Sequence, residues 1–322
     1  MKLVTFVAQG AERWGALLGG ADKALDLGAA LVARGLDAPR SMLAFVERSA
    51  ELEPIVRACI AEADAGGAPA AHLFDAAAVR LLAPLPRPPS MRDGYAFRQH
   101  VATARKNRGL EMIPEFDQFP VFYFTNHQAV TGPGDVEVEP MHLDRLDFEL
   151  EAAIVIGREG RNLTAADADA HVLGLTILND WSARELQLQE MKLGLGPAKG
   201  KDFATSLGPW LVTLDELESA RVAGPSGSAW NLTMTARVNG VEVSRGNLRD
   251  MTWTFAQIVE RASYGVTLHP GDVIGSGTVG TGCFLELNGS KLTHDQWLHP
   301  GDEVELSIDR LGTLANRVVR AR

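Results

Sequence analysis

The strongest pattern of hydrophobic and polar positions lies between Leu146 and Ile156. Apolar and acidic residues alternate from Leu146 to Glu151, and five apolar residues then follow without interruption. Period-two alternation predicts a β-strand, and a short apolar run predicts that this strand is buried on both faces. Because side chains alternate along a strand, Glu149 and Glu151 are expected to point to the same side, with their α-carbons about 6.5–7 Å apart.

Two carboxylates side by side next to a buried run need a positive partner, because burying like charges together is unfavourable. A divalent cation is the simplest partner. The pattern by itself leaves an alternative open, in which this is an edge strand with a solvated acidic face.

The first 85 residues predict a small α/β unit. Strands are expected at residues 2–7, 14–18 and 79–82, and helices at residues 24–33, 41–49 and 51–65. Cys59 lies on the apolar face of the last helix, which predicts core packing. Prolines crowd residues 83–89, and such a segment is extended and pairs poorly, as an inter-domain strap does. We therefore expect two domains, residues 1–85 and 86–322.

The rest of the chain predicts mostly β-structure. A turn at Asp93 and Gly94 is expected before a short helix at 95–106, and the lone His100 on such a helix is as a rule structural. Residues 109–140 lack periodicity apart from a strand at 121–124, which favours a lid or an oligomer contact. One helix is expected after residue 209, at 255–262. The expected strands there are 210–213, 232–238, 241–243, 273–275, 284–287 and 304–308.

Glycine marks several further segments. Two His-Pro-Gly-Asp tetrapeptides, at 269–272 and 299–302, predict turns. The segment 194–201 is glycine-rich but lacks the spacing of a Walker A motif, so it does not predict nucleotide binding. The glycine-dense segment 275–280 suggests backbone packed close to a ligand.

Composition excludes several classes of function. The chain has 322 residues, 46% of them hydrophobic, and a formal net charge of -10. An acidic chain without a basic run is a poor partner for nucleic acid or an anionic membrane surface. No stretch reaches the roughly 18–20 apolar residues that span a bilayer, and no signal peptide is evident. With two distant cysteines, Cys59 and Cys283, we expect unpaired thiols in a reducing cytoplasm.

Polar residues typical of a site gather around residue 180. The apolar run 173–178 predicts a strand that ends at Asp180, and a capping-box pattern from Ser182 predicts the start of a helix. Arg184 and Gln187, three residues apart, would share a face of that helix. Strand ends that lead into helix N-termini commonly bind anions or metals.

Five motifs occur in an order that resembles the fumarylacetoacetate hydrolase family. They are Asp-Gly-Tyr-Ala-Phe-Arg-Gln-His at 93–100, Leu-Asp-Phe-Glu-Leu-Glu at 146–151, Asn-Asp-Trp-Ser-Ala-Arg-Glu-Leu-Gln at 179–187, Gly-Lys-Asp-Phe-Ala-Thr at 200–205, and Gly-Ser-Gly-Thr at 275–278 with Leu-Glu at 285–286. Each motif alone is weak, but their order is specific. The resemblance implies an α+β, β-rich fold, with a mixed β-roll catalytic domain, a small N-terminal α/β domain and a homodimer.

The resemblance also implies a metal centre. Its four ligands would be the carboxylates of Asp93, Glu149, Glu151 and Asp180. An all-oxygen set suits a hard cation, so Mg²⁺ or Ca²⁺ is expected, with Mn²⁺ as a further option.

The resemblance assigns roles around this metal. His100 would be the general base, oriented by Glu286. Lys201, Arg184 and Gln187 would stabilise oxyanion charge as it develops. The residues expected to contact substrate are Tyr95, Tyr123, Thr278, Arg184 and Gln187.

The reaction that the resemblance implies is hydrolysis of a carbon–carbon bond in an acylpyruvate or a related β-diketo acid. The histidine and glutamate would activate water, and the metal would stabilise the enolate that is released. Three alternatives stay open: a decarboxylase, isomerase or hydratase of a related 2-keto acid on the same metal site, a binding protein without turnover, and glycoside hydrolysis by paired carboxylates.

The acyl end of the small keto-acid substrate is also open. Met191 stands where fumarylacetoacetate-specific members carry a tyrosine, and either Arg105 or Arg108 is the candidate to bind a substrate carboxylate.

Overall fold

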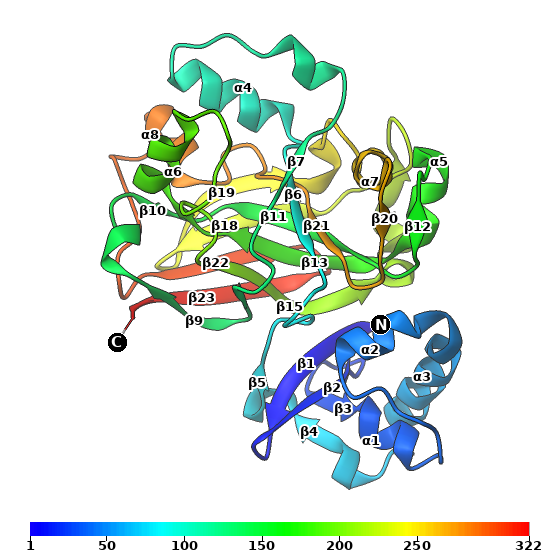
Figure 1. The fold of residues 1–322 in the computed structure, drawn as a ribbon. Coiled ribbons are helices and arrows are strands. Elements are labelled where there is room, and N and C mark those ends of the chain that lie inside the picture. Colours follow the sequence, from blue (N-terminus) through cyan, green and yellow to red (C-terminus); the bar gives the residue numbers. More distant parts are fainter. Residues whose placement is uncertain (322) are drawn as a thin grey trace.

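One large sheet of twelve strands runs through the computed structural model, which describes residues 1–321 (Figure 1). Strands from the N-terminal part of the chain pair directly with strands from its middle. The order along the sheet is β4 (Leu73–Asp75), β3 (Lys23–Asp26), β2 (Ala11–Leu17), β1 (Lys2–Ala8), β15 (Thr205–Thr213), β13 (Val172–Asp180), β11 (Leu150–Ile156), β21 (Val273–Gly275), β6 (Met91–Gly94) and β7 (Phe122–Phe124). Two short strands lie off this path, β5 (Arg80–Leu81) beside β1 and β8 (Val130–Thr131) beside β15.

The first 85 residues contain the predicted strands and helices with one exception. The helices are α1 (Leu27–Val32), α2 (Met42–Glu47) and α3 (Ser49–Asp64), and Cys59 is buried on α3 as expected. The helix predicted at 24–33 is wrong for its first three residues, because Lys23–Asp26 pairs with β2 as strand β3. Asp26 then accepts a hydrogen bond from the Ala29 amide, which starts α1. The division into domains at residues 85 and 86 stays a prediction.

Strand β11 explains why the sheet is central to the core. All seven of its residues are buried. Ala152, Ile154 and Ile156 pack into a cluster with the C-terminal strands, whereas Ala153 and Val155 pack into a cluster with the N-terminal helices. The uninterrupted apolar run therefore contributes side chains to two hydrophobic cores, one on each face of the strand, as the predicted burial on both faces requires. The acidic half differs from the prediction: residues 146–147 form a separate short strand, β10 (Leu146–Asp147), and the ladder of β11 begins only at Leu150.

A second sheet of five strands faces the large one across the main core. Its order is β19 (Val241–Asn247), β18 (Thr233–Val238), β22 (Glu303–Ile308), β23 (Gly312–Arg320) and β9 (Gly134–Val138). Three pairs of short strands complete the fold: β10 with β14 (Ser182–Ala183), β12 (Gly160–Arg161) with β20 (Thr267–Leu268), and β16 (Arg221–Ala223) with β17 (Ser228–Trp230). The strands predicted after residue 209 are found, except the one at 284–287.

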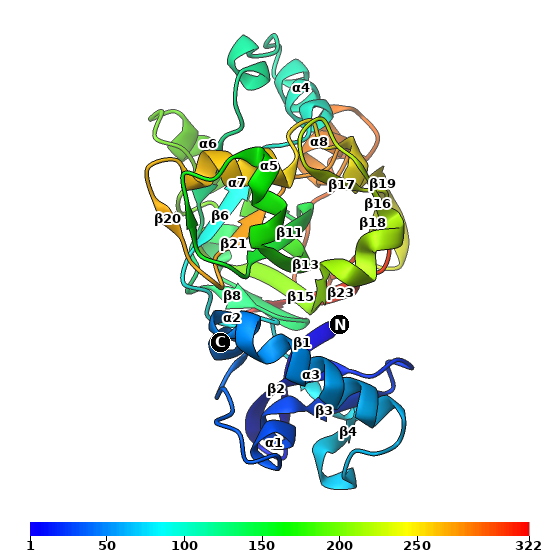
Figure 2. The same ribbon diagram turned by 90° about the vertical axis from the view of Figure 1, so that its right-hand side faces the viewer.

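Helices cover the end of the molecule opposite the N-terminal part (Figures 1 and 2). They include α4 (Arg98–Asn107), α6 (Arg184–Met191) and α8 (Phe284–Gly289), while α5 (Ala165–Ala168) and α7 (Phe255–Ser263) pack on each other. Helix α7 is the one predicted after residue 209, but α8 occupies the position of a predicted strand.

Three smaller predictions near the site are also corrected. Asp93 and Gly94 belong to strand β6 rather than a turn, since Asp93 pairs with Gly275 of β21. Helix α4 begins at Arg98, three residues later than expected. The capping box at Ser182 does not form, because the Ser182 hydroxyl donates to the Asp180 carbonyl instead of accepting from α6.

Both His-Pro-Gly-Asp segments are turns, as predicted. Asp272 and Asp302 each accept a hydrogen bond from the histidine amide of their own tetrapeptide. Within residues 1–321, no helix combines the length and apolarity needed to cross a membrane.

Candidate active site

Four buried carboxylates meet where neighbouring strands of the large sheet end. Asp93 lies on β6 and Glu151 on β11, with β21 between them, and Asp180 ends β13 on the other side of β11. Glu149 lies just before β11. One oxygen from each side chain lies within 4.8 Å of the others, and all four residues are buried. The structure thus brings together the four predicted metal ligands.

This crowding perturbs the carboxyl groups. Burial, followed by the charge of Asp180, raises the pKa of Asp93 to about 7. Burial also raises the pKa of Asp180 to about 6, although Lys201 opposes the shift. Burial and Asp93 raise the pKa of Glu151 well above its usual range. Glu149 differs: burial alone would raise its pKa, but the positive charges of Lys201 and Arg184 together lower it. The cluster therefore holds more negative charge than the protein neutralises.

An unpaired atom tests whether a cation fits. Asp180 Oδ1 is buried and has no hydrogen-bond partner among residues 1–321. A buried acceptor without a partner is unfavourable, and a cation would satisfy it. The ligand set contains only oxygen, which suits hard divalent cations rather than zinc. The residues present therefore fit a divalent metal ion.

Lys201 places a fixed positive charge beside the cluster. Its Nζ donates to Glu149 Oε2 and to Asp180 Oδ2, each at 2.6 Å. Although burial disfavours the ammonium form, these two carboxylates raise the pKa of Lys201 above its usual value. The hydroxyl of Tyr123 donates to the same Asp180 oxygen at 2.6 Å.

The glycine-dense segment packs directly against the carboxylates. The Gly277 amide donates to Glu151 Oε2 at 3.0 Å, and Thr278 Oγ1 donates to Glu151 Oε1 at 3.3 Å. A Cβ atom on Gly275 would lie 2.3 Å from Asp93 Oδ1, so this position has no room for a larger residue. The segment holds the carboxylates in place, which accounts for its glycine content.

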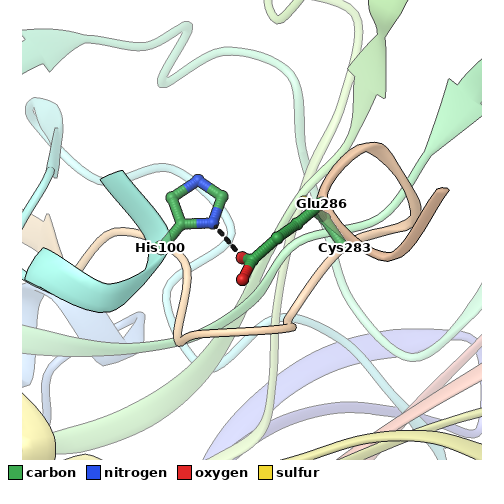
Figure 3. A group of neighbouring side chains, drawn as sticks. All are labelled: His100, Cys283 and Glu286. Atoms are coloured by element: carbon green, nitrogen blue, oxygen red, sulfur yellow. Dashed lines mark hydrogen bonds and ion pairs between the residues drawn. The ribbon is translucent and has the colours of Figure 1, made fainter. Parts of the chain in front are cut away.

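A histidine and a glutamate form a hydrogen-bonded pair near the cluster. His100 comes from α4 and Glu286 from α8, and these two helices pack on each other. The distance between His100 Nδ1 and Glu286 Oε2 is 2.6 Å (Figure 3). The Tyr95 ring contacts the His100 ring edge-on, with centroids 6.0 Å apart. Because Nδ1 is engaged with Glu286, Nε2 is the imidazole nitrogen left to meet a substrate.

A cavity of about 650 Å³ joins these elements. Asp93 and Glu149 reach its wall, while Glu151, Asp180 and Glu286 lie behind it. The other predicted site residues that line the cavity are His100, Tyr95, Tyr123, Arg184, Gln187, Lys201 and Thr278. These residues are brought together as expected, while the role of each stays a prediction.

The cavity lining includes one of the two candidate arginines and Met191, while their roles stay predictions. Arg108 lines it, whereas the Arg105 side chain donates to the Glu111 carbonyl and lies outside the lining. Met191 lines it as well, as do Val121 and Phe122 from the segment 109–140. The lining includes apolar residues that the sequence did not indicate, among them Leu188 and Trp297.

A model of the C-terminal part of fumarylacetoacetate (FAA) hydrolases matches residues 90–319. The chain belongs to this family. Oxaloacetate tautomerase YisK of Bacillus subtilis is 31% identical over 254 residues, which cover 76% of this chain and 75% of YisK. The mitochondrial oxaloacetate tautomerase Fahd2a of Rattus norvegicus is 31% identical over 285 residues, which cover 87% of this chain and 80% of Fahd2a.

Solved structures agree with the family assignment. A fumarylacetoacetate hydrolase from psychrophilic Exiguobacterium antarcticum has a TM-score of 0.74 and 28% identity, with both chains covered completely. A maleylpyruvate hydrolase from Sphingobium sp. SYK-6, solved with manganese(II) and pyruvate, has a TM-score of 0.71 and 24% identity over both complete chains. At that identity the likeness concerns the fold alone. The predicted α+β, β-rich fold of the fumarylacetoacetate hydrolase family is therefore confirmed.

One buried carboxylate beside the site was not among the predicted site residues. Asp147 is fully buried, and its carboxylate accepts hydrogen bonds from Arg184 and from the amides of Phe284 and Leu285, which open α8. Arg184 in turn donates to Glu149 Oε1 at 2.8 Å. Asp147 therefore connects the carboxylate cluster with the helix that carries the glutamate of the pair. The sequence offered one signal for Asp147, because it lies in the alternation of apolar and acidic residues from Leu146 to Glu151.

Proposed function

We propose that this protein is a divalent-metal-dependent tautomerase that interconverts the enol and keto forms of oxaloacetate or a closely related 2-keto acid. The observation that carries the proposal is the His100–Glu286 pair beside the cavity into which the carboxylate cluster opens. This arrangement suits proton transfer next to a chelated keto acid. Two relatives with at least 31% identity are named oxaloacetate tautomerases, which supports the choice of reaction.

The metal centre of this proposal is formed by Asp93, Glu149, Glu151 and Asp180. We propose Mg²⁺, Mn²⁺ or Ca²⁺ as the occupant, because all four ligands are carboxylates. When bound, such an ion supplies Lewis-acid polarisation of the 2-keto group and its neighbouring carboxylate.

His100 is the residue that moves the proton. With Nδ1 held by Glu286, the ring presents Nε2 to the cavity. In the keto-to-enol direction, Nε2 removes a proton from C3 of the substrate, and the protonated ring then gives this proton to the 2-oxygen. The reverse direction returns a proton to C3 and removes the one on oxygen. No atom other than hydrogen moves, so the step needs neither water nor an oxidant.

Charge that develops on the 2-oxygen is met by donors that are already in place. Lys201 is held by two carboxylates, and Arg184 is held by Asp147 and Glu149. Gln187 lines the cavity and accepts a hydrogen bond from Arg184 with its amide oxygen, which leaves its NH₂ group as the donor. Donors fixed before the reaction stabilise such charge without the cost of reorganisation.

Hydrolysis of a carbon–carbon bond in an acylpyruvate is the second candidate function. The cavity volume of about 650 Å³ favours it, because this space exceeds what a four-carbon acid needs and leaves room for an acyl group and a water molecule. In this reaction His100 would take its proton from water.

The oligomeric state is a separate proposal: we propose the homodimer that the family resemblance implies.

The deciding experiment follows the ultraviolet absorbance of enol-oxaloacetate and of a panel of acylpyruvates, with Mg²⁺ and with chelator. The proteins are the wild type, Glu149→Ala, and Glu159→Ala as a control for an exposed carboxylate that pairs with His269. The tautomerase proposal expects metal-dependent loss of enol absorbance with the four-carbon acid intact. Two carboxylic acid products from an acylpyruvate would favour hydrolysis, and carbon dioxide would favour a decarboxylase.

A further inference from the structure

A second group of possible metal ligands consists of the histidine–glutamate pair and Cys283. His100, Cys283 and Glu286 are all buried, and one ligand atom from each lies within 4.8 Å of the others. Cys283 is the N-cap residue that immediately precedes α8 and lies three residues before Glu286, while His100 projects from α4 (Figure 3). Neither the proton-transfer mechanism nor the carboxylate cluster uses the thiol.

The chemistry of this group differs from that of the carboxylate cluster. An imidazole nitrogen, a thiolate sulfur and one carboxylate oxygen form a ligand set typical of zinc, and three protein ligands leave a fourth position for water. The four-carboxylate cluster offers oxygen alone. Two neighbouring groups beside the same cavity therefore differ in the metals that they prefer.

The surroundings of Cys283 disfavour a thiolate that has no metal partner. Burial, and then the negative charge of Asp147, raise the pKa of the Cys283 thiol, while Arg184, which pairs with Asp147 and Glu149, opposes the shift. A divalent cation bound to the sulfur would supply the further positive partner that a thiolate needs at this position.

We propose that His100, Cys283 and Glu286 form a binding site for Zn²⁺ that inactivates the enzyme. The Zn²⁺ ion takes the position of the proton between His100 Nδ1 and Glu286. The Cys283 thiol loses its proton to water, the proton on His100 Nδ1 also leaves to water while Nε2 takes one up from water, and Glu286 binds as a carboxylate. The net change is the release of one proton, and no electron is transferred. With Nε2 protonated and Nδ1 bound to metal, His100 has no nitrogen left to accept a proton. The inhibitory part rests on the proposed function, whereas the binding part does not.

The binding part is tested with Co²⁺, which replaces Zn²⁺ and reports a thiolate ligand by charge-transfer absorption in the near ultraviolet. Wild-type protein saturated with Mg²⁺ is titrated with Co²⁺, alongside Cys283→Ala and Cys283→Ser. Cys59→Ala is the matched control, because Cys59 is the other buried free cysteine and lies on α3, away from the cavity. We expect the thiolate band in the wild type and in Cys59→Ala but in neither Cys283 variant.

The inhibitory part is tested by adding Zn²⁺ to the Mg²⁺-saturated enzyme during turnover. Substitution of Cys283 is expected to raise the half-inhibitory zinc concentration by at least about 10-fold, the lower end of what losing even an indirect metal partner costs. A wild-type protein without the cobalt band, or equal zinc sensitivity in the wild type and both Cys283 variants, would overturn the proposal. A cobalt band that depends on Cys283 in a protein that turns over no keto acid would count against the proposed function and not against this site.

Discussion

Arg184 and Asp147 form an ion pair that is shielded from solvent, with Arg184 Nε and Nη2 at 2.8 and 2.7 Å from Asp147 Oδ2. The same Nη2 atom lies 2.8 Å from Glu149 Oε1, so one guanidinium serves an anchoring carboxylate and a proposed metal ligand. Asp147 also accepts hydrogen bonds from the backbone amides of Phe148, Phe284 and Leu285. The charge at the cluster and the start of α8 therefore depend on one buried carboxylate.

The variant Asp147→Asn should weaken both halves of the site. The amide keeps the size of the side chain but places an NH₂ group where an oxygen accepted hydrogen bonds. Arg184 then retains Glu149 as its main anionic partner and competes with the metal for it. We expect metal affinity to fall about 10-fold or more and kcat to fall with it. Isothermal titration calorimetry with Mn²⁺ and steady-state kinetics measure the two effects.

A matched control separates this effect from a general loss of stability. Asp272 is equally buried and accepts hydrogen bonds from the His269 amide and the Ser90 hydroxyl, outside the lining of the cavity. The variant Asp272→Asn should lower Tm without changing metal affinity. If both variants lost metal affinity to the same extent, Asp147 would have no special connection with the cluster.

The metal should stabilise the protein more at high pH than at low pH. With pKa values of about 7 for Asp93 and about 6 for Asp180, the metal-free folded protein holds protons that the unfolded chain has already released. The stability of the metal-free protein therefore falls as pH rises through this range, while the deprotonated carboxylates bind metal better. We expect the Mg²⁺-induced rise in Tm to be larger at about pH 8 than at about pH 5.5. Thermal denaturation in Mg²⁺ or chelator tests this, and an equal rise at both pH values would contradict it.

Lys201 should matter for turnover more than for metal binding. Removing its charge in Lys201→Gln frees Glu149 and Asp180 from their shared ammonium, so the cluster keeps its ligands. The loss of a fixed donor near the reacting oxygen is expected to lower kcat by about 10²–10³-fold. The control is Lys199→Gln, since Lys199 is exposed and pairs with Asp202. A Lys201 variant that binds no Mn²⁺ would show instead that the ammonium organises the metal centre.

The acidic strand shows what the sequence could predict. The uninterrupted apolar run of β11 fixes burial on two faces, and the Glu149-x-Glu151 spacing places two carboxylates on one side of it. These features are local, because they depend on the period of a strand alone. The convergence with Asp93 and Asp180 rested on the family resemblance.

Two misses have physical reasons. The four residues 284–287 are too few to distinguish a strand from a helix by period, and α8 is stabilised by Asp147, whose position 137 residues earlier cannot be read locally. Strand β23 was missed because Asn316 occupies a buried position in its alternation. The Asn316 amide donates to the carbonyls of Gly132 and Gly134, so a polar side chain is accommodated by partners far away in the sequence.

The histidine–glutamate pair gives the most direct test of the chemistry. In His100→Gln the proton acceptor is lost, and in Glu286→Gln an amide that can also donate no longer fixes which imidazole nitrogen carries the proton. Each change should lower kcat by about 10²–10⁴-fold. Neither residue belongs to the carboxylate cluster, so the affinity for Mn²⁺ should stay at the wild-type value. The control is His142→Gln, because His142 is a buried histidine that stacks on Phe203 and does not line the cavity. A His100 variant with the kcat of His142→Gln would exclude His100 as the base and would make Lys201 the next candidate for that role.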